Sequence, residues 1–240
     1  MKYLLLLLTM TATVHAENAL ELLKESDKAR GAIGDGLSWA LTIDTEEDGE
    51  ASSREFDVKV KGPDALVEAS APARNKGEVY IFNDRNMWFY KPTLKKPVAI
   101  SARQKLTGQA ANGDIASTNY ARDYDPTIEK TEDINKEKFF VLMLKAKTDN
   151  LTYDKIRYWI SAKSKLAIKA EFLNLQGQAF KIGELTYKNS IKAGGKTIPF
   201  VSELKITDAK FPKNISIIKY KNPKAEKLSD SIFNVNNLSR

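Results

Sequence analysis

The chain has 240 residues, of which 42% are hydrophobic and 29% charged, so it has the composition of a folded globular protein rather than a disordered one. It contains no cysteine and one histidine, His15, which excludes disulfides, thiolate nucleophiles and cysteine-based metal sites. The formal net charge is +7 and comes from lysines spread along the sequence. Such a spread is typical of the solvated faces and protected edges of strands.

The amino terminus has the pattern of a secretory signal peptide. A single lysine precedes a run of five leucines, and small residues follow up to Ala16. The apolar run is much shorter than the roughly 20 residues that a transmembrane helix requires. Val14 and Ala16 suit cleavage after Ala16, so we expect a signal peptide at 1–16 and one mature domain at 17–240. A buried amino-terminal strand or helix is the alternative.

Cleavage at this point removes the only histidine. The mature chain then offers neither His nor Cys, which excludes a histidine general base and a serine–histidine triad, and we expect no metal and no cofactor. Loss of Lys2 leaves 37 basic and 31 acidic residues, a net charge of +6. For an exported protein we expect no nucleic-acid partner, while a basic face for anionic membranes stays open as an alternative.

The mature chain begins with a helical pattern and then changes to strands. Residues 18–30 predict a helix with a partly apolar face, which Gly31 ends. Residues 37–43 and 55–61 alternate apolar and polar side chains, the pattern of strands with one buried and one wet face. The acidic, glycine-containing stretch 44–53 between them is predicted to be a hairpin connection.

The rest of the chain continues the strand pattern. Strand-like segments follow at 65–71, 78–82, 87–91, 97–101, 138–147, 155–161, 166–175, 178–188, 198–207 and 215–220. Many are separated by short turns such as Ala193-Gly194-Gly195, which predicts a continuous antiparallel meander in one domain, closed or nearly closed. Residues 104–127 interrupt this rhythm and predict a long loop with a short helix, which we expect to act as a movable lid.

One acidic stretch is close to a calcium-binding loop. Asp44 to Gly49 with Glu55 at the twelfth position approaches the pattern, but Glu46 and Ala51 depart from it and the flanks are strands rather than helices. We therefore predict an acidic hairpin tip without calcium dependence. Carboxylates are abundant elsewhere, so a hydrolase built on two carboxylates stays open, although no pair stands out.

Two strands carry apolar side chains on both faces. Trp88-Phe89-Tyr90 and the run from Phe139 to Leu144 must point apolar groups to opposite sides of the sheet. Either both faces are packed by protein, or one face contacts a ligand. The concave side of a wrapped sheet must be filled by side chains, helices or a ligand.

One stretch of the sequence resembles the central signature of the outer-membrane lipoprotein-sorting family, the LolA-like lipoprotein carrier superfamily. It reads Gly77-Glu78-Val79-Tyr80-Ile81-Phe82-Asn83-Asp84-Arg85-Asn86-Met87-Trp88-Phe89-Tyr90-Lys91-Pro92. Segments 97–101, 114–124 and 153–160 and the hairpin around Gln176-Gly177 follow in the family's order. The resemblance implies a mainly β (α+β) fold. It would be a single open or incomplete antiparallel β-barrel, with an N-terminal helix and short helices covering the concave face.

The resemblance also implies a function in outer-membrane biogenesis. It points to a monomeric periplasmic carrier or chaperone, not an enzyme, that binds the acyl chains of a lipid or lipoprotein in a hydrophobic cavity. An inner-membrane exporter and an outer-membrane acceptor are the implied partners. A sensor or interaction module on the same fold, with its cavity filled by its own side chains, is the alternative.

The apolar phases of the strands select candidates for this cavity. The seven candidates are Trp39, Leu41, Phe56, Val58, Phe89, Met143 and Tyr158. For Phe89 and Met143 both phases of the strand are apolar, so the pattern alone does not decide which face they occupy.

Overall fold

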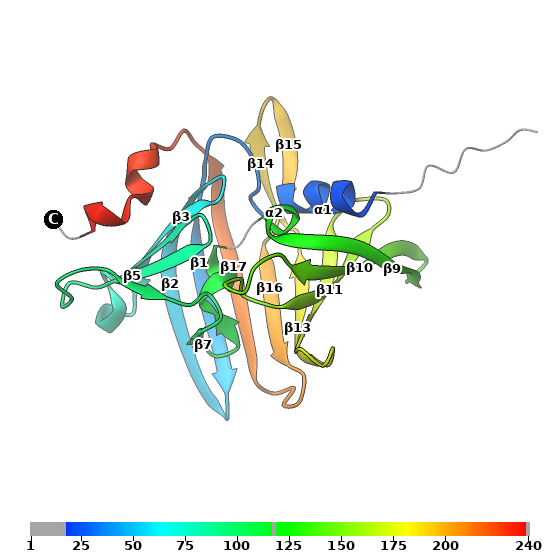
Figure 1. Cartoon of the computed structure of the whole chain (residues 1–240), viewed down its shortest axis with the longest axis horizontal. Helices are drawn as coiled ribbons and strands as arrows, with labels where there is room; N and C mark the ends of the chain where they lie inside the picture. Colours follow the sequence, from blue (N-terminus) through cyan, green and yellow to red (C-terminus); the bar gives the residue numbers. More distant parts are fainter. Residues whose placement is uncertain (1–17, 117–118, 239–240) are drawn as a thin grey trace, which may run out of the picture.

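The computed structural model describes residues 18–116 and 119–238, and the expected signal peptide at 1–16 lies outside them. One antiparallel sheet of 13 strands dominates it (Figure 1). In spatial order the strands are β6 (Val98–Ile100), β5 (Asn86–Tyr90), β4 (Val79–Asn83), β3 (Asp64–Ala71), β2 (Glu50–Lys61), β1 (Leu37–Glu47), β17 (Ile215–Ala225), β16 (Glu203–Asp208), β13 (Ala179–Thr186), β12 (Ala167–Leu173), β11 (Lys155–Ser161), β10 (Glu137–Ala146) and β9 (Tyr124–Ile134). Because β6 and β9 stand at opposite ends of this order, the sheet is an open barrel, which confirms the predicted fold class.

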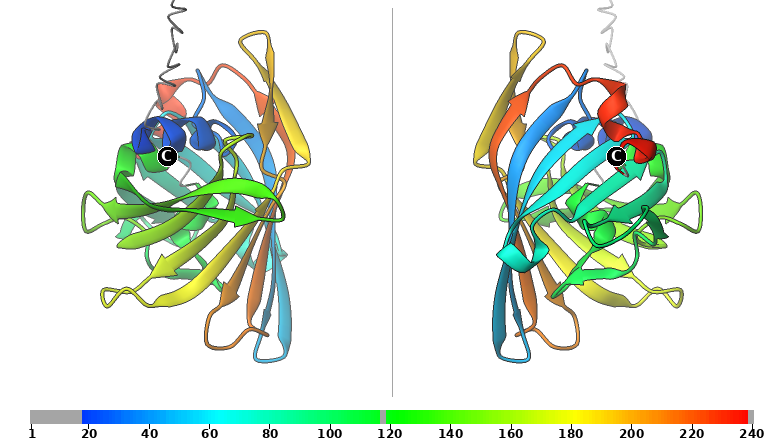
Figure 2. Two further views of the ribbon diagram at one scale, coloured as in Figure 1. Left: turned by 90° about the vertical axis from the view of Figure 1, so that its right-hand side faces the viewer. Right: turned by 90° about the vertical axis from the view of Figure 1, so that its left-hand side faces the viewer.

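Short elements surround the sheet. Two small hairpins pair β7 (Lys105–Thr107) with β8 (Ala110–Ala111) and β14 (Asn189–Ala193) with β15 (Lys196–Phe200). The helices are α1 (Ala19–Lys28) and α2 (Tyr120–Asp123), and the 3-10 turns are η1 (Ala73–Asn75), η2 (Asn112–Ile115), η3 (Asp230–Phe233) and η4 (Val235–Asn237). Helix α1 is capped by the Asn18 side chain and packs against α2, β9 and β11 (Figure 2). Neither helix in the described residues is long and apolar enough to cross a membrane.

The first hairpin is longer than its sequence pattern predicts. Strand β1 continues to Glu47 and β2 starts at Glu50, so only Asp48 and Gly49, both with positive φ, make the turn. The predicted connection over 44–53 is therefore wrong. Its polar residues belong to the two strands and use polar contacts instead of an apolar phase; Asp44, for example, accepts from Ser53 and Lys219.

Most other predicted strands are confirmed, but one predicted segment is divided, and β7, β8, β9 and β14 were not predicted. The segment 198–207 is divided at Val201-Ser202 into β15, which belongs to a separate hairpin, and β16 of the main sheet. Strand β9 was not predicted, because it is an edge strand whose side chains are mostly exposed and therefore carry no apolar alternation.

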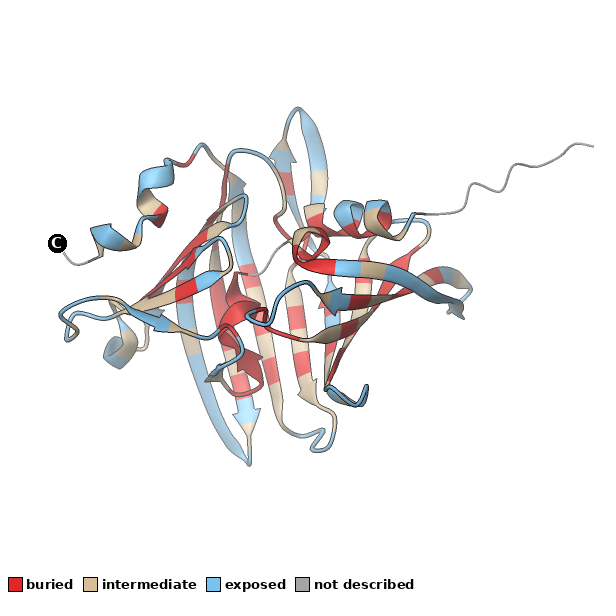
Figure 3. Cartoon of the chain, in the orientation of Figure 1, coloured by how far each residue is buried: buried red, intermediate tan, exposed pale blue. Residues whose placement is uncertain are grey.

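The two doubly apolar strands are packed by protein on both faces. On β5, Phe89 faces the main core, while Trp88 and Tyr90 pack on the outer side against residues 228–238 of the C-terminal segment. On β10, even-numbered residues such as Leu142 face the main core, and Phe139 and Val141 join an outer cluster with Trp159. Figure 3 shows buried residues on strands across the sheet and on the short elements in front of it, and exposed residues at the hairpin ends.

Candidate functional site

The concave face of the sheet is the natural place for an apolar site, and the chain itself fills it. One continuous cluster of buried apolar side chains joins the inner faces of the strands to α1, α2 and residues 101–116. We call residues 101–116, which contain β7, β8 and η2, the covering segment. The segment predicted to be a loop and lid is thus folded against the sheet, and residues 109–116 are buried.

The covering segment is fixed to the middle of the sheet by polar contacts. The Gln109 N–H donates to Ser216 Oγ of β17 at 2.7 Å, and Lys181 Nζ of β13 donates to the Gln109 carbonyl at 2.6 Å. On β2, Arg54 donates to the Leu106 carbonyl at 3.4 Å. The segment therefore crosses several strands of the open barrel, as Figure 1 shows for β7 in front of β1 and β17.

Two glycines allow this close approach. A Cβ atom at Gly108, which has φ of +51°, would lie 2.4 Å from Ser216 Oγ, and one at Gly113 would lie 1.8 Å from Thr152 Oγ1. Both distances are far below van der Waals contact, so any side chain at these positions would force the covering segment away from its neighbours.

A second set of polar groups is buried under the helices. Asp27 on α1 is 1% exposed, and its Oδ2 accepts the N–H of Ala121 in α2 at 2.7 Å. Burial raises the pKa of Asp27 to about 7, and the nearby Arg30 partly opposes this shift. The Arg30 guanidinium lies 4.1 Å from the centre of the Tyr120 ring, a cation–π contact between the turn after α1 and α2.

The covering segment contributes a further buried carboxylate, Asp114. Its oxygens accept hydrogen bonds from the Tyr153 hydroxyl at 2.9 and 3.1 Å and from the Ala111 N–H at 2.8 Å. Burial raises the pKa of Asp114 above its ordinary value, and Lys181 and these hydrogen bonds only partly oppose this rise. Charged groups inside an apolar core are costly unless they are paired, so these contacts make the position of the covering segment specific.

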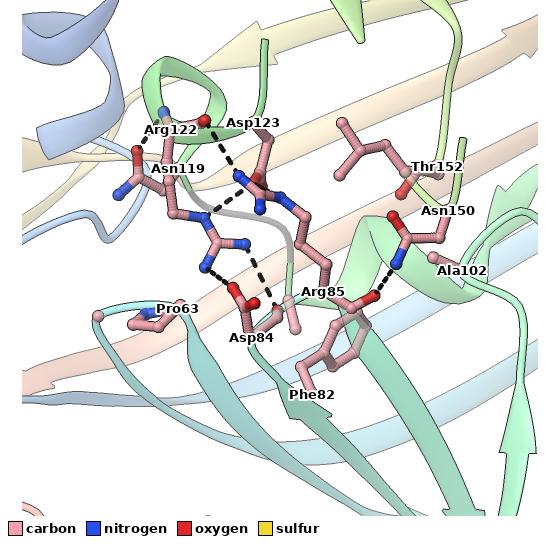
Figure 4. A pocket seen from close by; sticks show the side chains of 13 residues that line it. Pro63, Phe82, Asp84, Arg85, Ala102, Asn119, Arg122, Asp123, Asn150 and Thr152 are labelled. Atoms are coloured by element: carbon pink, nitrogen blue, oxygen red, sulfur yellow. Dashed lines mark hydrogen bonds and ion pairs between the residues drawn. The ribbon is translucent and has the colours of Figure 1, made fainter. Parts of the chain in front are cut away.

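A charged cluster connects the two ends of the sheet (Figure 4). Arg122 of α2 pairs with Asp84 at 3.0 Å and with Asp123 at 2.8 Å, and Arg85 pairs with the same Asp123 oxygen at 3.1 Å. Asn150, in the connection after β10, donates to the Arg85 carbonyl at 2.9 Å. We call these five residues the clasp.

The position of the clasp follows from the curvature of the sheet. Strands β4 and β5 lie near one end of the strand order and β10 near the other, yet the clasp joins the β4–β5 turn to the connection after β10. Side chains, rather than a backbone ladder, close this part of the barrel. Beneath them Phe82, Ala102, Ala116 and Leu151 line a cleft of about 30 Å³, room for about two water molecules.

Most of the predicted cavity residues lie together in the main apolar cluster. The side chains of Trp39, Leu41, Phe56, Val58 and Tyr158 are buried there. Phe89 is half-buried against the same cluster, with its ring 5.0 Å from that of Tyr80.

Met143 is the exception. It is only partly buried and lies opposite Arg157 on β11, whose guanidinium pairs with Glu129 and Glu171 outside the barrel. The inward prediction for Met143 is therefore wrong. Both phases of β10 are apolar because the strand also contributes Phe139 and Val141 to the outer cluster.

The polar residues of the site were not predicted from the sequence. In the predicted helix 18–30, Asp27 and Arg30 continue the i, i+4, i+7 row that begins at Leu23, so two charged residues on its apolar face were the available signal; in the structure Arg30 lies just after the end of α1. The clasp had no comparable signal, because its members come from three distant segments.

Comparisons with known proteins agree with this architecture. A family model described only as one for an uncharacterized protein matches residues 62–240. A LolA superfamily protein from Nitrosomonas europaea is 29% identical, with a TM-score of 0.82 over 92% of this chain and 100% of its own. A putative outer membrane lipoprotein-sorting protein domain from Vibrio parahaemolyticus is 21% identical, with a TM-score of 0.76 over 92% and 98%.

A third solved structure shares the fold. A DUF1329 family protein from Desulfovibrio piger is 18% identical, with a TM-score of 0.76 over 92% of this chain and 97% of its own. No curated protein matches the chain. The chain belongs to the family whose model matches residues 62–240, and it has the LolA-like fold of these solved structures.

Proposed function

We propose that the protein is a periplasmic carrier or chaperone that binds the acyl chains of a lipid or lipoprotein between the sheet and the covering segment. The observation that supports this proposal most is that polar contacts hold a cover over an apolar face. An extended apolar concave face lies under a cover that is held by side-chain hydrogen bonds and ion pairs. The LolA superfamily and lipoprotein-sorting relatives support it at the level of the family.

The energetics favour enclosure without covalent chemistry. Exposure of an acyl chain to water costs about 0.8 kcal/mol for each CH₂ group, so a carrier must bury most of the chain. In the structure, the cleft beneath the clasp has a volume of only about 30 Å³. Cargo must therefore displace the cover and exchange the contacts of the core for contacts with the acyl chain.

The clasp and the covering segment supply a route for this exchange. The ion pairs of the clasp are partly buried, but they join side chains only and take no part in the backbone pairing of the sheet. Their separation would part the two ends of the sheet next to the apolar residues Phe82 and Leu151. The interior would then open without loss of any pairing between neighbouring strands.

The experiment that tests the proposal places one charge on each face of the sheet. We expect Phe89→Glu to weaken the binding of a fluorescent fatty-acid probe by tenfold or more, because an unpaired charge inside the apolar site is costly. Met143→Glu makes the same change on the outer face and should leave binding within about twofold of the wild type. Probe fluorescence titration of lipid-stripped protein measures both.

Folding is checked in parallel. Circular dichroism and denaturant unfolding should show native-like protein for both variants, and the milder Phe89→Ala separates loss of the site from loss of the fold. Equal binding by Phe89→Glu and Met143→Glu would contradict a site on the concave face.

A second candidate function rests on the filled interior. Because the chain's own side chains occupy the concave face, an interaction module that carries no lipid is the alternative. Failure of stripped wild-type protein to bind any acyl probe would select it.

A further inference from the structure

The outer face of the sheet carries a second site, centred on Trp88. Its cross-strand neighbours are Ile81 on β4 and Ala99 on β6. Ile81 is fully buried in the cluster that packs under the C-terminal segment, whereas Ala99 is exposed and offers only a methyl group. The indole therefore packs on the β4 side, while its β6 side faces only the methyl group of Ala99.

Amide groups surround the accessible indole. Asn83, Asn86, Asn234 and Asn236 line a groove of about 490 Å³ with Trp88, a volume within the range of small-molecule sites. Pro97 and Val235 form its apolar walls. The groove lies where the C-terminal segment runs over the outer side of β3 and β4 (Figure 2, right).

Most of these amides are unused by the protein. Asn234 Oδ1 accepts the Asn236 N–H, but the side chains of Asn83, Asn86 and Asn236 make no hydrogen bond within the described part of the chain. Each carboxamide offers two donor hydrogens and an acceptor oxygen. The groove contains no acidic residue among those that line it, and Lys96 is its one charged side chain.

We propose that this groove binds a neutral oligosaccharide. The apolar C–H face of a pyranose ring fits against an indole that is flat, accessible on one side and fixed on the other. Carboxamides suit adjacent sugar hydroxyls, because they donate to one oxygen and accept from its neighbour. The acyl chain of a lipid cannot form hydrogen bonds with the carboxamides. A polyanion would have only one positively charged partner in the groove, Lys96.

The site is independent of the carrier function. It lies on the face opposite the concave core, and its residues take no part in the clasp or the covering segment. A glycan bound here would hold the protein near polysaccharide while the concave face remains available.

The test is titration calorimetry of the full mature chain with two probes, a β-linked tetramer of N-acetylglucosamine and cellotetraose. We expect saturable binding of at least one of them. Asn86→Ala should weaken binding about fivefold, the equivalent of one net hydrogen bond. Trp88→Leu keeps an apolar contact with Ile81 and should weaken binding by about two- to tenfold through loss of stacking.

Two controls make the outcome decisive. Gln176→Ala removes an exposed carboxamide on the β12–β13 turn and should leave sugar binding unchanged. Phe89→Glu, which is designed to block the concave site, should also bind sugar normally, so the two proposals fail separately. Absence of binding to both tetramers, or binding that survives both Asn86→Ala and Trp88→Leu, would overturn the proposal.

Discussion

Substitution of Gly113 by alanine is expected to destabilise the protein by about 1–3 kcal/mol, the usual cost of overpacking a core. The new Cβ would lie 1.8 Å from Thr152 Oγ1 and 2.9 Å from Thr152 Cβ, so rotation of the threonine alone cannot relieve the clash. Movement of the backbone would weaken the Gly113 N–H bond to the Ala102 carbonyl and the neighbouring contacts of buried Asp114. Denaturant unfolding followed by circular dichroism measures the loss.

A double-mutant cycle identifies the cause. Thr152→Ala removes Oγ1 and Cγ2 and so the worst of the collision, although the Thr152 Cβ remains, and Gly113→Ala should therefore cost less in the Thr152→Ala background. Gly183→Ala is the matched control, because its Cβ would lie no closer than 3.2 Å to Leu204 Cδ1 and 3.3 Å to the Phe172 ring, and we expect a smaller effect there. Additive losses in the cycle would show that the covering segment is not held as described.

Substitution of Asp27 by asparagine is expected to remove most of a pH dependence of stability. Burial raises the pKa of Asp27 to about 7 in the folded protein, from 3.8 for the unperturbed group. The folded state therefore binds more protons than the unfolded state between these values, and the free energy of unfolding falls as the pH rises through them. The shift in the pKa of Asp27 corresponds to a decrease in the free energy of unfolding on the order of 4 kcal/mol between pH 4 and pH 8.

The asparagine variant keeps an oxygen that accepts the Ala121 N–H but carries no charge. We expect it to melt at a higher temperature than the wild type at pH 8 and to approach it near pH 5. Asp149→Asn, at an exposed carboxylate, serves as the control. Parallel melting curves of wild type and Asp27→Asn across this pH range would contradict the assigned burial.

The apolar framework was predictable from the sequence because it obeys simple periodicities. The alternation in β1 and β2 places Trp39, Leu41, Phe56 and Val58 on one face, and these side chains do meet in the core. Prediction failed where a strand has two apolar faces, as at Met143, or none, as in β9. In both cases the pattern carries no information about which side is buried.

The polar parts of the site depend on contacts between distant segments. Asp84 and Arg122 are 38 positions apart, and Gln109 and Ser216 are 107 apart. No local spacing indicates such pairs, because they form only when the sheet curves and the covering segment folds onto it. Residues 104–127, which include most of the covering segment, were predicted as a long loop with a short helix, since their small residues and glycines give no sign of how tightly they pack.

The most direct test of the carrier account is native mass spectrometry of protein that is expressed with its predicted signal peptide and purified without detergent, followed by extraction and identification of the bound lipid. The account predicts a mass excess that corresponds to an acyl-bearing molecule, which Phe89→Glu loses and Met143→Glu retains. The carrier account would be contradicted if wild-type protein carries no lipid as purified and also binds no acyl probe when one is supplied.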